Sequence, residues 1–176
     1  MADFSKFGEI SNEWNDYVRI YGTPPPLPVG KVALEKLQET TNRSREEASM
    51  RHMAQEDITS KVEIETIHIS APDNYSIPVR IYKPKHLGVP TSTPKLPIYL
   101  FYHGGGFMFG TLDSEDAGCS RIVVYMDIIV VNICYRHTPQ HPFPAAPSDA
   151  LDSFDWVSPT VSEDLANFHL LDYGTS

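Results

Sequence analysis

A near-continuous apolar run at residues 128–134 is the feature that most constrains how this chain can fold. A strand with one face in water alternates apolar and polar residues, so a run without alternation indicates a strand buried on both faces. Helical patterns precede and follow the run, and other strand-like segments lie at 96–102 and 168–171. The order strand, helix, strand, helix, strand predicts a parallel α/β sheet with crossover helices. The apolar positions that predict the helices are Cys119, Ile122, Val123 and Met126 in the first, with Asp113 as N-cap, and Ala150, Leu151, Phe154 and Val157 in the second.

Two further strands are expected before this region. Apolar residues alternate over 62–69 and again over 77–81, and the turn residues Asp73-Asn74 lie between them, which predicts an antiparallel hairpin. The apolar parity shifts at Ile67, which indicates a bulge or a twist in the first strand. Pro78 has no N–H for sheet pairing, so we expect the second strand at an edge of the sheet.

Residues 1–60 are polar with a helical pattern, interrupted by the proline-rich segment 24–28. One helix is expected over Val32–Glu39. A second is expected to begin at Ser44, because Ser44-Arg45-Glu46-Glu47 fits the S-x-x-E capping box. The apolar side of this second helix would contain Met50, Met53 and Ala54.

The charge balance excludes two classes of partner. The chain has 14 basic and 23 acidic residues, a net charge of −9, whereas nucleic acids and anionic membranes are bound by clustered Lys and Arg. No stretch approaches the roughly 20 apolar residues of a membrane span, and the N-terminus has no signal-peptide pattern. Cys119 and Cys134 fit no zinc or CxxC pattern, so we expect two free thiols and a cytoplasmic location.

The strongest chemical motif is His103-Gly104-Gly105-Gly106-Phe107, directly after the strand expected at 96–102. Glycines have no Cβ, so the backbone can turn sharply and bring its N–H groups close to a ligand. Two such N–H groups can stabilise the oxyanion that forms on a carbonyl under attack. A plain glycine turn is the alternative interpretation of these residues.

With a second motif, the chain resembles a known family. After the apolar run come Tyr135-Arg136, Pro139, the segment Pro142–Ala146 and Asp149. Together with HGGGF these residues resemble the hormone-sensitive-lipase-like branch of the α/β hydrolases, also called α/β-hydrolase fold-3, and its fungal members in particular. The departures from the family pattern are Cys134 for Asp, His137-Thr138 for Leu-Ala, and Gln140 for Glu.

The resemblance implies the N-terminal half of an α/β-hydrolase fold. Residues 1–60 would be an N-terminal helical cap segment, and residues 61–176 an incomplete hydrolase core. Gly174-Thr175-Ser176 would be the start of the G-x-S-x-G nucleophile elbow, with Ser176 as nucleophile; a polar C-terminal tail is the alternative. Gly105 and Gly106 would supply the oxyanion donors, with His103 and Gly104 supporting the loop.

In this fold the triad acid and base follow the nucleophile, so they would lie beyond Ser176. All seven histidines precede it, and Asp149 is expected to be an anchor at a helix N-terminus rather than the triad acid. The implied function is carboxylic-ester hydrolysis of a small-molecule ester without metal or cofactor, with little or no activity from these residues alone. A non-catalytic small-molecule binding or scaffold protein, or a lyase, are the alternatives, and self-association through an exposed sheet edge is expected. The histidines are His52, His68, His86, His103, His137, His141 and His169.

Overall fold

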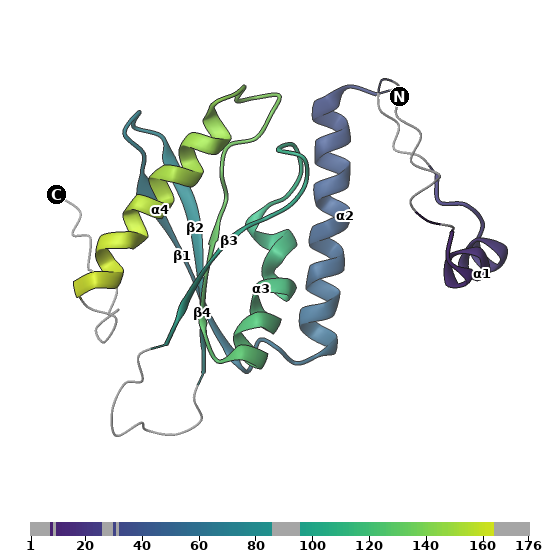
Figure 1. The fold of residues 1–176 in the computed structure, drawn as a ribbon, viewed down its shortest axis with the longest axis horizontal. Helices are drawn as coiled ribbons and strands as arrows, with labels where there is room; N and C mark the ends of the chain where they lie inside the picture. Colours follow the sequence, from purple (N-terminus) through teal and green to yellow (C-terminus); the bar gives the residue numbers. More distant parts are fainter. Residues whose placement is uncertain (1–7, 9, 26–29, 31, 86–95, 164–176) are drawn as a thin grey trace. The chain divides into compact units, whose positions relative to one another are not determined.

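The structure is a computed structural model that describes residues 8, 10–25, 30, 32–85 and 96–163, with side chains to residue 158. Four strands form one mixed sheet in the order β1-β2-β4-β3 (Figure 1). The pairs β1–β2 and β2–β4 are antiparallel, and β3–β4 is parallel. The parallel pairing expected for the strand-helix-strand unit is therefore confirmed, and the hairpin extends the sheet with antiparallel strands. The strands are β1 Val62–Ser70, β2 Ser76–Pro84, β3 Ile98–Tyr102 and β4 Ile129–Ile133.

The sheet is covered by helices on both faces. α3 (Leu112–Met126) packs on one face with α2 (Leu34–Gln55) outside it, and α4 (Ala145–Glu163) covers the other (Figure 1). β4 lies inside this arrangement, and four of its five residues are buried, as its apolar run predicts. The core therefore has two layers, one on each side of the sheet.

The hairpin β1–β2 is present, but it contains no bulge. Its register runs without interruption from Val62↔Pro84 to Ser70↔Ser76. The apolar parity shifts because the two halves of β1 serve opposite faces of the sheet. Val62 and Ile64 pack in the layer with α3, whereas Ile67 and Ile69 pack in the layer with the α4 residue Trp156.

The expectation that Pro78 places its strand at the sheet edge is wrong. β2 lies between β1 and β4. In an antiparallel strand the N–H and C=O of a residue point to the same neighbour, and the Pro78 carbonyl accepts from Cys134 N at 3.0 Å on the β4 side. The β2–β4 register covers only Val79–Tyr82, so the missing N–H lies just beyond the paired segment.

The N-terminal helices also differ from the expectation. α2 is one helix of 22 residues, so Ser44 lies inside it and caps nothing. Thr40, Thr41 and Asn42 are weak helix formers but not helix breakers, and the contacts that α2 makes with the loop before α3 and with α3 outweigh this weak propensity. Of the expected apolar side, Met53 packs partly buried against the core, whereas Met50 is 67% exposed.

α3 begins two residues earlier than expected. Its N-cap is Thr111 rather than Asp113, since Thr111 Oγ1 accepts from Ser114 N while Thr111 N donates to Ser114 Oγ. Cys119 and Val123 are buried as predicted, whereas Met126 is 66% exposed.

α4 buries only part of the side predicted: Val157 is buried, but two of the other predicted positions are not. Leu151 and Phe154 are 67% and 55% exposed, although their spacing marks them as apolar positions. The helix is oriented instead by a buried carboxylate, which is described below with the site. The residues that it buries are Ala146, Asp149, Ser153 and Val157.

The chain divides into two compact units, residues 1–33 and 34–176. The first contains α1 (Asn12–Tyr21), which begins where Ser11 Oγ accepts a hydrogen bond from Trp14 N. Trp14 and Tyr17 stack along one side of α1, and no residue of this helix is buried. The domain boundary expected at residue 60 stays a prediction, and the strand expected at 168–171 lies outside the described residues.

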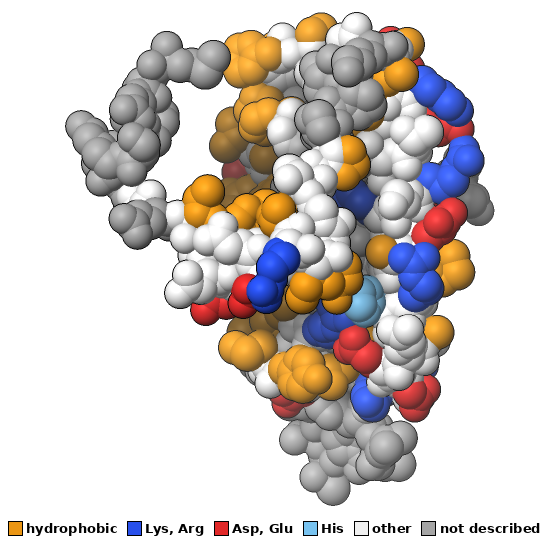
Figure 2. Space-filling model, turned by 90° about the vertical axis from the view of Figure 1, so that its right-hand side faces the viewer, with side chains coloured by type: hydrophobic (Ala, Val, Ile, Leu, Met, Phe, Trp, Pro, Cys, Tyr) orange, Lys and Arg blue, Asp and Glu red, His pale blue; other side chains and the backbone are white. Residues whose placement is uncertain are grey.

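Acidic and basic side chains are interspersed on the face that Figure 2 shows. Ion pairs along α2 include Lys36–Glu39 at 2.7 Å. Within the described ranges, no helix combines the length and apolar character needed to cross a membrane.

The core can be tested at β4. Ile133 is fully buried, so Ile133→Ala removes apolar contacts and leaves a cavity. We expect the free energy of unfolding to fall by about 2–5 kcal/mol in urea denaturation. Met50→Ala, at a position 67% exposed, is the control and should change it by less than about 0.5 kcal/mol. Equal effects of the two substitutions would contradict the burial of β4.

Candidate functional site

The glycine loop, residues 103–110, connects the end of β3 to the N-cap of α3. Its backbone has positive φ at Gly105 (141°), Gly106 (61°) and Phe107 (60°), and again at Gly110 (120°). A Cβ on Gly105 would lie 2.1 Å from the Phe109 carbonyl oxygen, and one on Gly110 would lie 2.2 Å from the His103 ring. Glycine is therefore required at these two positions by both backbone and space, whereas a Cβ on Gly106 would meet nothing within 4 Å.

The glycine loop is held mainly through its carbonyl oxygens. Donors come from within the loop, from α2 and from the segment after β4. No hydrogen bond between described residues uses the amide N–H of Gly105 or Gly106. Gly105 is partly exposed and Gly106 is exposed, so solvent or a ligand can reach this part of the loop, at the C-terminal end of β3. The bonds to carbonyl oxygens run from Tyr135 Oη to His103 (2.6 Å), Arg45 Nη1 to Gly104 (3.4 Å), Phe109 N to Gly105 (3.0 Å), Thr138 N to Phe107 (2.9 Å) and Gln38 Nε2 to Met108 (2.6 Å).

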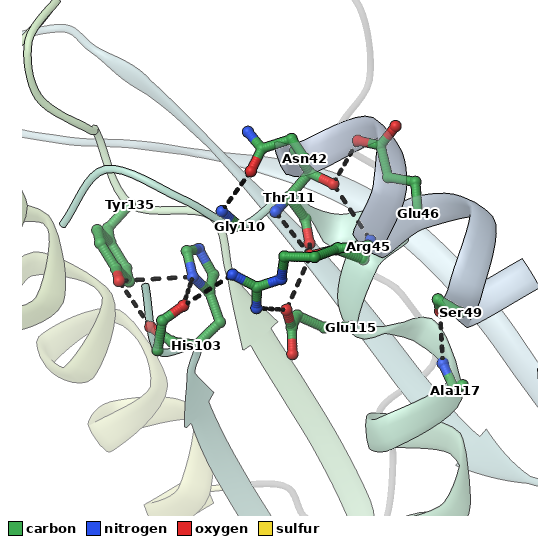
Figure 3. A network of polar contacts seen from close by, with 12 residues as sticks. Asn42, Arg45, Glu46, Ser49, His103, Gly110, Thr111, Glu115, Ala117 and Tyr135 are labelled. Atoms are coloured by element: carbon green, nitrogen blue, oxygen red, sulfur yellow. Dashed lines mark hydrogen bonds and ion pairs between the residues drawn. The ribbon is translucent and has the colours of Figure 1, made fainter. Parts of the chain in front are cut away.

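α2 contributes polar contacts that the sequence patterns did not reveal. In Figure 3, Asn42, Arg45, Glu46 and Ser49 all point from α2 toward the glycine loop and the start of α3. Because helix positions three and four apart share a face, the sequence shows these residues only as a row of polar side chains on one side of a helix. Such a row usually faces water, so it did not indicate contacts with the loop. The bonds are Gly110 N to Asn42 Oδ1 (2.8 Å), Thr111 Oγ1 to Glu46 (2.7 Å), Ala117 N to Ser49 Oγ (3.1 Å) and the ion pair Arg45–Glu115 (2.6 Å).

Three aromatic rings pack together where the glycine loop meets the segment after β4, those of His103, Tyr135 and His137. The His103 and Tyr135 rings stack with centroids 4.5 Å apart, and His137 lies 5.0 Å from His103 and 4.9 Å from Tyr135. Burial lowers the pKa of His103, and burial together with the neighbouring His103 lowers the pKa of His137 to about 4. Both imidazoles are therefore neutral at neutral pH, and their packing supports the loop conformation.

Asp149 does not anchor a helix N-terminus, contrary to expectation. It lies in the second turn of α4, fully buried, and accepts from Arg136 N at 2.7 Å and from Arg136 Nη2 at 2.6 Å. Arg136 also bonds Asp73 at 2.7 Å and lies 4.4 Å from the centroid of the Tyr75 ring. This charged cluster fixes the segment after β4 against α4. Both oxygens of the Asp149 carboxylate accept hydrogen bonds from Arg136.

The structure brings His103, Gly104, Gly105 and Gly106 together at the end of β3. Ser176, with Gly174 and Thr175, lies outside the described residues. Among the residues that the structure does describe, no cluster of three or more His, Cys, Asp or Glu side chains could hold a metal ion. Cys119 and Cys134 are free thiols, the first buried and the second partly buried.

A family model described as the α/β hydrolase fold matches residues 99–170. The chain also superposes on a solved esterase of Pyrobaculum calidifontis with a TM-score of 0.64 and 25% identity, over 90% of this chain and 45% of that one. The chain has the α/β-hydrolase fold. The fold that HGGGF and the later motif imply is thereby confirmed, and the match supports the expected α/β-hydrolase family.

Several curated relatives of this chain are named as esterases. Esterase LipI of Mycobacterium tuberculosis is 47% identical over 62 residues, which are 35% of this chain and 19% of the relative. Carboxylic ester hydrolase LipN of the same organism is 38% identical over 103 residues, 58% of this chain and 26% of the relative. The chain thus spans well under a third of the length of these relatives. That the chain is a fungal-type member of the family stays a prediction.

The partly buried His137 makes the stability of the fold depend on pH. Its pKa is about 4 in the folded chain and about 6.5 when unfolded, so as pH falls the unfolded chain binds the proton first. Its contribution to stability is complete above about pH 6.5 and is lost as the pH falls toward about 4. Urea denaturation at about pH 7 and pH 5 should show a larger loss of stability in the wild type than in His137→Leu. An equal loss in both proteins would refute this assignment.

Proposed function

We propose that this protein is a serine carboxylic-ester hydrolase in which the Gly105 and Gly106 amides stabilise the oxyanion. The observation that carries the proposal is the fixing of the glycine loop through its carbonyl oxygens, which leaves these two amides unused by the described residues. The loop follows a parallel strand of an α/β-hydrolase fold, and similar proteins named as esterases support the same reaction.

The proposed reaction is attack by a serine Oγ on the ester carbonyl carbon. The carbonyl π electrons move to oxygen, and the two N–H groups donate to the resulting oxyanion. A base removes the Oγ proton during the attack and returns it to the departing alcohol as the tetrahedral intermediate collapses, and water then hydrolyses the acyl-enzyme. Ser176 is the proposed nucleophile, on the strength of the sequence Gly174-Thr175-Ser176. Esters with small or medium acyl groups are the proposed substrates, and a cytoplasmic location stays part of the proposal.

A nucleophilic serine also needs a base. Of the described groups near the loop, His103 is buried and His137 partly buried in the ring stack, and Asp149 is paired with Arg136. Each is already committed to a structural contact. We therefore expect residues 1–176, assayed alone, to hydrolyse esters slowly or not at all.

The described sheet also suggests a surface for self-association. β3 pairs with β4 on one side, and within the described ranges no strand pairs with its other side. Tyr99 and Tyr102 on β3 are 47% and 37% exposed. Because an unpaired edge can bind another strand, we propose that copies of the chain associate here.

Tyr99→Lys should shift the chain toward monomer in light scattering coupled to gel filtration, because a charged side chain on the edge disfavours pairing with another strand. A wild type that is already monomeric would contradict the proposal.

The hydrolase function can be tested on the natural protein, in whatever length the cell makes it, with p-nitrophenyl butyrate. Ser176→Ala should abolish hydrolysis. Gly105→Ala should reduce kcat by about 100-fold or more, since the new methyl group displaces the loop from the Phe109 carbonyl.

Gly106→Ala is the matched control. It has room for its Cβ and keeps its N–H, so it carries only the backbone strain of positive φ, a cost of about 1–2 kcal/mol that the fold can absorb. Its loss of kcat should be much smaller than that of Gly105→Ala. An active Ser176→Ala variant, or equal losses in the two glycine variants, would contradict the assigned roles. Binding of the ester without turnover would instead support a non-catalytic binding protein.

A further inference from the structure

Five side chains on one face of α2 bond to the glycine loop, to the segment after β4 and to α3. They stand at positions 38, 42, 45, 46 and 49, where the spacings of three and four keep them on one side of a helix. Figure 3 shows four of them reaching from α2 across the loop to the start of α3. α2 is therefore docked on the loop by specific hydrogen bonds.

Gln38, at the end of this row nearest the N-terminus of α2, uses all of its hydrogen-bonding groups. Its Nε2 donates to the Met108 carbonyl at 2.6 Å and to the Thr138 carbonyl at 3.2 Å. Its Oε1 accepts from Gln140 Nε2 at 2.8 Å. An amide has two N–H donors on nitrogen and accepts on oxygen, so both ends of Gln38 are matched to their partners.

Gln38 joins the two segments that shape the glycine loop. Met108 follows the positive-φ residues Gly105–Phe107, and Thr138 holds the Phe107 carbonyl through its N (2.9 Å) and its Oγ1 (3.1 Å). A single side chain thus ties residue 108 to residue 138, on either side of the Phe107 carbonyl. Without the Gln38 amide, the Met108 and Thr138 carbonyls would each lose a hydrogen-bond donor.

Gln140 determines which way the Gln38 amide is oriented. A carboxylate at position 140 would accept but not donate, so it would repel Gln38 Oε1. Gln38 could turn its nitrogen toward that carboxylate, but its oxygen would then face the Met108 and Thr138 carbonyls. Gln38 and Gln140 therefore depend on each other.

We propose that Gln38 is a positioning residue for the oxyanion-binding loop and that Gln140 fixes the orientation of its amide. The effect on catalysis rests on the proposed hydrolase function, whereas the effect on the loop does not. Because the oxyanion exists only in the transition state, a displaced loop lowers kcat and leaves KM nearly unchanged.

The test compares Gln38→Glu, Gln140→Glu and Gln55→Glu in the natural protein. Gln55 is exposed at the C-terminal end of α2, so Gln55→Glu makes the same chemical change on the same helix away from the loop. Hydrogen exchange of the hydrogen-bonded loop amides, those of Met108, Phe109 and Gly110, should accelerate about tenfold in the first two variants, the size of one lost hydrogen bond, and stay unchanged in the third. Exchange in β1 and β2 should stay at the wild-type rate in all three. Gln140 is exposed, so its variant is expected to fold even if Gln38→Glu does not.

A double mutant tests the coupling between the two residues. Adding Gln140→Glu to Gln38→Ala should have no further effect on loop exchange, because the partner is already absent. For an active enzyme, Gln140→Glu should lower kcat about tenfold with KM within about twofold. Wild-type loop exchange in both Glu variants, or additive effects in the double mutant, would overturn the inference while leaving the hydrolase proposal intact. Absence of esterase activity with accelerated loop exchange would refute the hydrolase function and leave the positioning role standing.

Discussion

The candidate site depends on the hydrogen bonding of the carbonyl oxygens in one glycine loop. Backbone amides can bind an oxyanion only if they are not used inside the protein, and they can be left unused only if something else holds the chain. In residues 103–110, donors from Tyr135, Thr138 and Gln38 supply that hold through carbonyls. Because Gly105 and Gly110 have no Cβ, the loop can fold back on itself, with Gly105 against the Phe109 carbonyl and Gly110 against the His103 ring.

The sheet gives the loop a rigid base. β4 is buried between α3 on one face and α4 on the other, so β3 beside it has a fixed position. The Arg136–Asp149 pair then fixes the segment after β4 against α4. Its charges are buried together with several hydrogen bonds, which is the condition under which a buried ion pair can be tolerated. Thr138 in this same segment binds the loop, so the cluster and the loop are connected through three residues of backbone.

Much of the fold could be predicted because it follows from local patterns. The apolar run of β4 and the alternation in β1 and β2 reflect burial that is repeated along each strand. The errors arose where a tertiary contact overrode the local pattern. Ser44 has the residues of a capping box but lies within α2, and Leu151 and Phe154 have core spacing but are exposed because α4 buries Asp149 instead. Pro78 is accommodated in a central strand because its missing N–H lies just beyond the β2–β4 register.

The sequence by itself determined the chemistry available to this protein: a glycine loop after a short apolar strand, in a pattern shared with α/β hydrolases. These are properties of residue type and spacing, so they can be recognised without knowing which residues lie nearby in the folded chain. Only the tertiary structure decided what holds the loop. Gln38 and Gln140 are 102 positions apart, and no periodicity links them. A polar side chain on a helix has the same local pattern whether it faces water or a carbonyl, so its role is settled only when the two segments meet.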